Sequence, residues 1–141
     1  INTGENRILR ADIIQDCGNS LNVNIDIGQI EGGFIQGLGW LTCEELCFSQ
    51  EGKLLTTGPS TYKLPGSRDV PPIFNVKLLE NADNDEKTIF RSKAVGEPPL
   101  LLAISHFLAL KEAIKASLPS SKAELLNSPA TPSEILKAIY A

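Results

Sequence analysis

The sequence predicts an α+β fold for a single soluble domain of 141 residues. Two observations predict it: the chain begins with a pattern of period two, typical of a strand, and then changes to the three-to-four spacing of helices, which returns twice near the C-terminus. A composition of 42% hydrophobic and 21% charged residues is ordinary for a globular domain that buries one core. We therefore expect residues 1–141 to form one domain.

The first element is a half-buried strand over residues 7–14. Leu9, Ala11 and Ile13 alternate with polar residues, so they face one side of an extended chain. The sequence DCGNSLN then predicts a turn.

A helix is expected to follow from Asp26. Asp26 as N-cap, with Gln29 three residues on, resembles a capping box. Apolar residues then recur at the spacing of one helical stripe: Ile27, Ile30, Phe34, Leu38 and Leu41.

This predicted helix is rich in glycine. Gly28 and Gly32, and likewise Gly33 and Gly37, lie one turn apart, although a glycine inside a helix costs on the order of 1 kcal/mol relative to alanine. Two interpretations stay open: tight packing against another backbone, or close approach of a flat ligand.

The middle of the chain predicts two hairpins joined by an irregular segment. Residues 42–57 are typical of two strands around a turn at 50–52. Residues 58–72, with four prolines, predict an irregular connection. The patterns at 73–80 and 88–92 then predict a second pair of strands, flanking a polar turn.

Two helices complete the prediction. The first begins at Pro98 and Pro99 and runs over residues 98–117. Its expected apolar stripe consists of Leu101, Ile104, Leu108 and either Ala113 or Ile114. The second runs to Tyr140 and begins with Thr131 as N-cap, Pro132 and a capping-box Glu134.

Glu97 is the most unusual candidate for a functional residue, because it precedes the proline-started helix within the sequence VGEPPLLL. The helix N-terminus favours the ionised carboxylate, whereas burial beside Val95 and the leucines would favour the neutral acid. The structural alternative, a simple capping role, also stays open, although Glu is a poor N-cap. Gly96 would permit close approach of a ligand.

Several function classes find no support in the sequence. The net charge of −4 without a basic block argues against nucleic acid, and no apolar run is long enough to span a bilayer. Three cysteines and one histidine, His106, fall short of a zinc site or a nucleophilic triad, so we assign no metal-ligating residues and expect reduced thiols in a cytoplasmic protein. If the chain is enzymatic, its reactive centre comes from a cofactor.

Four blocks in order carry a resemblance to a known family: 26–46 (DIGQIEGGFIQGLGWLTCEEL), 58–65 (GPSTYKLP), 92–105 (SKAVGEPPLLLAIS) and 127–136 (NSPATPSEIL). Together they resemble the C-terminal part of the molybdopterin-binding subunit of the xanthine dehydrogenases, within the molybdenum hydroxylase family that also contains the aldehyde oxidases. The sequence KAVGEPP is similar to the xanthine dehydrogenases in particular. The tryptophan in QGLGWLT and the ending ILKAIYA resemble bacterial members, and a first residue Ile1 with no methionine in the chain suggests a piece of a larger polypeptide.

The resemblance implies roles for two residues. Glu97 matches the general base, which takes a proton from a molybdenum-bound hydroxyl as that oxygen attacks a purine ring carbon and hydride passes to a sulfido ligand. Gln29 matches a residue that contacts the molybdenum cofactor. The alternative in which Gln29 completes a capping box with Asp26 stays open. The implied reaction oxidises hypoxanthine or xanthine to urate.

The resemblance also implies components outside this chain. These are the rest of the subunit with most of its molybdopterin contacts, and an iron–sulfur and FAD component, in an oligomeric enzyme. We expect the fragment alone to be inactive and to expose apolar surface at the glycine-rich helix and at residues 58–72. Two alternatives remain: a sibling hydroxylase acting on aldehydes or other N-heterocycles, and a noncatalytic assembly module of the same fold.

Overall fold

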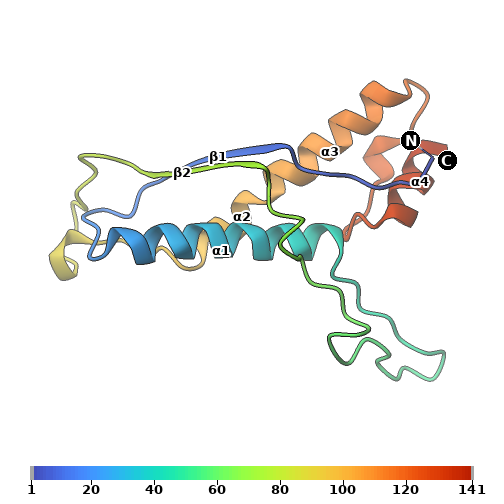
Figure 1. Ribbon diagram of the computed structural model, residues 1–141, viewed down its shortest axis with the longest axis horizontal. Coiled ribbons are helices and arrows are strands. Elements are labelled where there is room, and N and C mark those ends of the chain that lie inside the picture. The colour runs from blue at the N-terminus through green and yellow to red at the C-terminus, as the bar shows by residue number, and fades with distance from the viewer. Residues whose placement is uncertain (1, 141) are drawn as a thin grey trace.

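The computed structural model describes residues 2–140 and has the mixed α+β composition that the sequence predicts (Figure 1). Its elements, in chain order, are β1 (Arg10–Gln15), α1 (Val23–Thr42), β2 (Ile73–Leu78), the 3₁₀ helix η1 (Ile89–Arg91), α2 (Pro98–Leu102), α3 (Ile104–Ser117), the 3₁₀ helix η2 (Ala123–Leu125) and α4 (Pro132–Tyr140).

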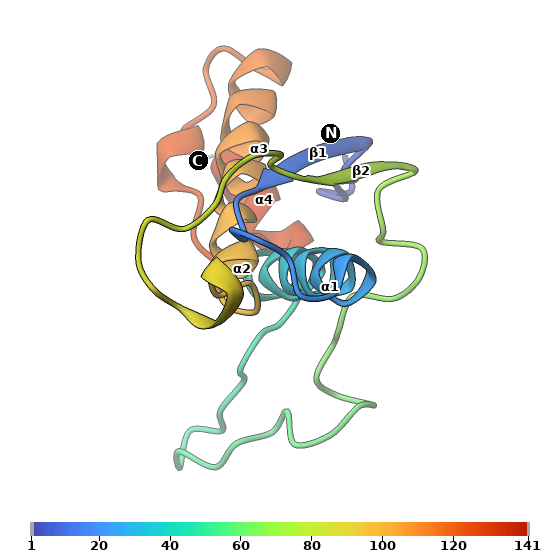
Figure 2. The ribbon, with the colours of Figure 1, turned by 90° about the vertical axis from the view of Figure 1, so that its left-hand side faces the viewer.

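The two strands form a small parallel sheet that lies along α1, as both views show (Figures 1 and 2). Ala11 pairs with Phe74 and Ile13 with Val76, so all four side chains turn toward the helix. The Phe34 ring of α1 packs on the Phe74 ring at 5.6 Å between centroids. One apolar cluster therefore joins the sheet to the stripe of α1 that the sequence predicts.

The predicted second hairpin is wrong. Residues 73–80 do contain a strand, β2, but it pairs with β1, while residues 89–91 form η1. Phe90 and Arg91 adopt positive φ angles of 51° and 59°, which a strand does not allow. Parallel pairing with β1 places β2 on α1, where Phe74 and Val76 pack against the apolar cluster. This burial, rather than pairing with the next segment of the chain, determines the partner of β2.

The predicted N-cap of the first helix is also wrong. The helix begins at Val23, and the Asn22 side chain caps it by accepting a hydrogen bond from the Ile25 N–H at 3.2 Å. Asp26 therefore lies inside the first turn, where its carboxylate accepts a hydrogen bond from the Ser20 hydroxyl at 2.6 Å.

The predicted first hairpin is reduced to one antiparallel bridge, between Phe48 and Leu54. The turn at 50–52 is present, with Gly52 at a φ of 79°. In both views the segment between α1 and β2 extends away from the sheet and helices (Figures 1 and 2), so a longer hairpin would find no surface on which to bury a face. Residues 58–72 are irregular, which confirms the prediction for them.

The predicted helix over 98–117 is present but divided at Ala103 into α2 and α3. The expected apolar stripe is wrong, because Leu101, Ile104 and Leu108 are 58%, 43% and 56% exposed. Of the predicted stripe only Ile114 is buried, and the other buried positions are Pro99, Ala103 and Leu110.

The C-terminal elements form a second apolar cluster. Leu110 and Ile114 of α3 pack there with Ala123 of η2 and with Ile135 and Ile139 of α4.

Helix α4 begins at Pro132 and runs to Tyr140, as predicted, and the Thr131 hydroxyl accepts from the Glu134 N–H. The capping box is incomplete, because the Glu134 carboxylate pairs with Lys137 and the Thr131 N–H donates to the Pro129 carbonyl.

Candidate functional site

Glu97 occupies the N-cap position of α2, and Pro98 is the first residue of the helix, which confirms the predicted helix start. The Glu97 side chain makes no capping hydrogen bond and is exposed, whereas Val95 two residues earlier is buried. The helix therefore does not use the carboxylate of Glu97, which remains available for contact with a ligand.

Close packing of α2 on α1 fixes the position of Glu97. A Cβ atom placed on Gly37 would lie 2.2 Å from the Leu100 backbone oxygen, and one placed on Gly33 would lie 3.1 Å from the Pro99 Cβ. Since real Cβ atoms essentially never approach to less than 3.0 Å, no side chain fits at Gly37 without movement of α2. The packing interpretation is thereby confirmed for this pair of glycines.

The other glycine pair of α1 lies on an open face. A Cβ atom at Gly28 or Gly32 would meet nothing within 4 Å. Gln29 is exposed beside these two glycines. Because α1 begins at Val23 with Asn22 as its N-cap, Gln29 lies inside the helix and takes no part in a capping box.

The fold brings Gln29 next to the residue that precedes Glu97. Its Oε1 atom lies 3.6 Å from the point that a Cβ of Gly96 would occupy. Gln29 lies in the second turn of α1 and Gly96 lies just before α2, so the contact joins two segments that are distant in sequence. No spacing in the sequence could have indicated this contact, which depends on the packing of α2 against the glycine face of α1.

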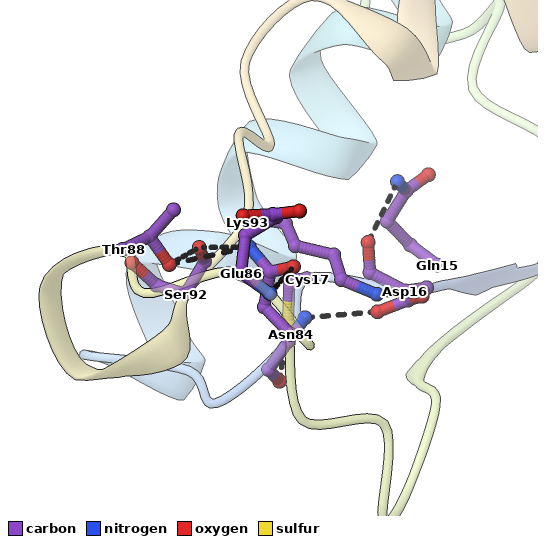
Figure 3. A network of polar contacts seen from close by, with 9 residues as sticks. Gln15, Asp16, Cys17, Asn84, Glu86, Thr88, Ser92 and Lys93 are labelled. Atoms are coloured by element: carbon purple, nitrogen blue, oxygen red, sulfur yellow. Dashed lines mark hydrogen bonds and ion pairs between the residues drawn. The ribbon is translucent and has the colours of Figure 1, made fainter.

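A polar network holds the chain just before Glu97 (Figure 3). The Lys93 ammonium pairs with the Asp16 carboxylate at 2.5 Å, and the Lys93 backbone N–H donates to the Cys17 carbonyl at 2.8 Å. The Asn19 N–H donates to the Arg91 carbonyl at 3.1 Å. The Lys93 ammonium, together with a hydrogen bond from the Gly18 N–H, lowers the pKa of Asp16 below its ordinary value.

The same network closes the loop that leads into η1. The Thr88 hydroxyl donates to the Ser92 carbonyl at 2.7 Å, and the Asn84 side-chain amide donates to the Thr88 hydroxyl at 3.2 Å (Figure 3). The ion pair between Asp16 and Lys93 was not predictable from the sequence, because the two residues are 77 positions apart.

The remaining chemically notable side chains are the three cysteines and the histidine. Cys17 is a buried free thiol whose pKa is raised chiefly by burial, and Cys43 and Cys47 are half-buried free thiols. His106 lines a groove of about 390 Å³ between β1 and α3, and burial lowers its pKa. Neither Gln29 nor Glu97 lines this groove.

Residues 2–140 hold neither a cluster of metal-ligating side chains nor a membrane-spanning helix. No three His, Cys, Asp or Glu side chains gather there as metal ligands. No helix of the described part is both long and apolar enough to cross a membrane.

The sequence of residues 1–71 matches a protein family described as the molybdopterin cofactor-binding domain. This is half of the chain and includes β1, all of α1 and Gln29.

Two curated relatives show how much of a longer protein the chain represents. The chain is 54% identical to the xanthine dehydrogenase/oxidase of Felis catus, over 96% of the chain and 11% of that protein. It is 54% identical to the xanthine dehydrogenase of Dictyostelium discoideum, over 82% of the chain and 8% of that protein. The chain thus spans about a tenth of these relatives, and they do not confirm the predicted bacterial type.

Solved structures share the fold. Quinoline 2-oxidoreductase from Pseudomonas putida 86 superposes with a TM-score of 0.79 at 29% identity, over 94% of this chain and 16% of that one. CO dehydrogenase from Oligotropha carboxidovorans gives a TM-score of 0.80 at 21% identity, over 96% of this chain and 16% of that one. The arrangement of β1, β2 and the helices therefore recurs inside much longer chains.

Proposed function

The chain belongs to the molybdopterin cofactor-binding domain family, and from this premise we propose that residues 1–141 form the C-terminal part of the cofactor-binding domain of a xanthine dehydrogenase. In this proposal Glu97 is the general base and Gln29 a contact to the molybdenum cofactor. The observation that carries it is the position of Gln29 beside Gly96, together with the uncommitted carboxylate of Glu97.

The residues present fit such a group. The Gln29 amide offers one acceptor oxygen and two N–H donors. The open face at Gly28 and Gly32 leaves room for a flat ligand next to that amide, because nothing lies within 4 Å of either position where a Cβ would stand. When bound, the molybdenum–molybdopterin group supplies an activated oxygen and takes up electrons from the substrate.

Glu97 would act on the proton of the attacking oxygen. Its exposed carboxylate accepts that proton at one Oε atom, which increases the nucleophilicity of the oxygen as it approaches an electron-poor ring carbon. The packing of α2 on Gly33 and Gly37 holds the backbone of Glu97 in place while its side chain stays free. General bases of this kind contribute about 10²–10⁴-fold in rate.

The test uses the full-length enzyme loaded with its cofactor. Glu97→Gln is nearly isosteric with the wild type and removes the base, so urate formation is expected to fall by about 10²–10⁴-fold with molybdenum content unchanged. Glu124→Gln is the matched control, because Glu124 is also exposed and lies at η2. Turnover above about a tenth of wild type in Glu97→Gln would remove the assignment.

A second candidate substrate class is an N-heterocycle other than a purine. It is favoured by the likeness to quinoline 2-oxidoreductase, whose name gives such a substrate for that protein. The higher identity to xanthine dehydrogenases favours hypoxanthine and xanthine. Steady-state rates on xanthine, quinoline and an aldehyde distinguish these classes.

The activity proposed belongs to the whole protein, with an iron–sulfur and FAD component, in a cytoplasmic oligomer. The chain alone is expected to be inactive. A full-length protein that lacks molybdenum after expression in a host that makes the cofactor would favour a noncatalytic assembly module instead.

A further inference from the structure

We propose that the ion pair between Lys93 and Asp16 positions Glu97, and that these two residues set the placement of the carboxylate without touching the substrate. The inference rests on the proposed function, since it concerns the same carboxylate. It is carried by the contacts of Lys93 with Asp16 and Cys17, four residues before Glu97 (Figure 3).

The first step of the argument is that this segment is held at its downstream end. Helix α2 packs on Gly33 and Gly37 of α1 so closely that it has no room to slide toward α1. Pro98 and Pro99 restrict the backbone immediately after Glu97.

The second step is that the upstream end depends on contacts with one turn of chain after β1. Besides the ion pair, the Lys93 N–H donates to the Cys17 carbonyl at 2.8 Å, and Gly18 forms a bridge with Ser92. Gly18 has a φ of 63°, and a Cβ atom there would lie 2.3 Å from the Arg91 carbonyl oxygen. The backbone of residues 17–19 thus packs directly against the backbone of residues 91–93, with no room for a side chain at Gly18.

The third step concerns what the ion pair adds to these backbone contacts. Asp16 Oδ1 accepts from the Gly18 N–H at 2.9 Å, while Oδ2 accepts from the Lys93 ammonium at 2.5 Å. One carboxylate therefore fixes both the turn and the lysine. Three residues separate Lys93 from Glu97, and the middle one, Val95, is buried in the core and cannot move outward without losing that burial.

The consequence is a segment of five residues, from Lys93 to Glu97, that is fixed at both ends and exposes Glu97. Catalytic groups lose about 10²-fold in rate when displaced by about 1 Å. Release of the upstream end should therefore reduce the rate of turnover while leaving the rest of the fold in place.

The experiment uses the full-length enzyme with Lys93→Met, which keeps the length of the side chain and removes its charge. We expect kcat to fall by about 10- to 100-fold with little change in KM. Lys93→Arg retains the charge and should recover most of the loss. Asp16→Asn, which is nearly isosteric, should reproduce it, and the double variant should lose no more than either single one.

A readout independent of turnover is hydrogen exchange of the peptide that covers residues 92–97, measured on cofactor-free protein. We expect about tenfold faster exchange there in Lys93→Met and no change in the peptide of α1. The matched control is Lys115→Met, which removes an ion pair with Glu112 on the exposed side of α3, and which should leave exchange and kcat unchanged.

Three outcomes separate the possibilities. Unchanged exchange and unchanged kcat in both Lys93→Met and Asp16→Asn would overturn the inference. Faster exchange throughout the chain would also overturn it, because the pair would then support the whole fold rather than one segment. Full turnover in Glu97→Gln would refute the proposed function instead, while the exchange measurement would still test whether the pair orders residues 92–97.

Discussion

Substitution of Gly37 by alanine tests whether the glycine face of α1 sets the position of α2. The new Cβ atom would lie 2.2 Å from the Leu100 backbone oxygen and 2.9 Å from the Ala103 Cβ. Ordinary contact begins at 3.4 Å, so α2 must withdraw by about 1 Å. A backbone oxygen cannot rotate out of the way as a flexible side chain can.

The magnitude follows from two opposing effects. Overpacking of this kind costs about 1–3 kcal/mol, whereas replacing glycine by alanine in a helix stabilises it by about 1 kcal/mol. Gly32→Ala is the matched control, because Gly32 is in the same helix and its Cβ would meet nothing within 4 Å. Gly32→Ala should gain the helical stabilisation alone, so the two variants should differ by about 1–3 kcal/mol.

The assay is urea unfolding of the two variants and the wild-type chain, followed by circular dichroism. Gly32→Ala should be more stable than wild type, and Gly37→Ala should be the less stable of the two variants. A Gly37→Ala variant as stable as Gly32→Ala would refute this prediction, since α2 would then not rest on that glycine. In the full-length enzyme, displacement of α2 by about 1 Å should lower kcat by on the order of 10²-fold, because Glu97 moves with it.

Two further predictions concern stability. Hydrogen bonds from Arg10 and Asn75 lower the pKa of Asp12 from its ordinary value of 3.8 to about 2. The ionised carboxylate therefore contributes to the stability of the fold in full above about pH 4, and this contribution is lost as the pH falls toward about 2. Asp12→Asn should flatten the dependence of the melting temperature on pH in that window. Asn22→Ala should cost about 1 kcal/mol of unfolding free energy by removing the N-cap of α1. Asn24→Ala is the matched control and should cost much less in the same urea titration, because Asn24 is exposed in the first turn of α1 and is not the capping residue.

The elements that the sequence predicted well are those determined by neighbouring residues. The apolar stripe of α1 is present because Ile30, Phe34, Leu38 and Leu41 share one face regardless of what packs on it. Helix α4 begins as predicted because the Thr131 hydroxyl accepts from the Glu134 N–H, a contact within one turn.

The errors concern choices between distant partners. Leucine and isoleucine lie all around the helix pair α2 and α3, so the periodicity could not determine which face is buried. The face that contacts α1 carries Pro99 and Ala103, since these small residues fit against glycine, and Leu101, Ile104 and Leu108 consequently face outward. The parallel pairing of β2 with β1 likewise depends on burial against α1 and not on the turn that follows β2.

The candidate site divides in the same way. The start of a helix at Pro98 was predictable from two prolines, and with it the N-cap position of Glu97. The proximity of Gln29 to Gly96, and the ion pair of Asp16 with Lys93, required the packed structure because each contact joins residues more than 60 positions apart in the sequence.

Helix α1 has three faces with different physical properties, and this separation explains why its glycines must be interpreted in pairs. One face is apolar and carries the sheet, a second has Gly33 and Gly37 against α2, and a third has Gly28 and Gly32 open beside Gln29. Alanine on the second face forces a backbone apart, whereas alanine on the third meets no atom of this chain. A loss of turnover in the full-length enzyme on substitution at Gly28 or Gly32, with stability raised, would therefore have to come from a group outside residues 2–140 that approaches Gln29.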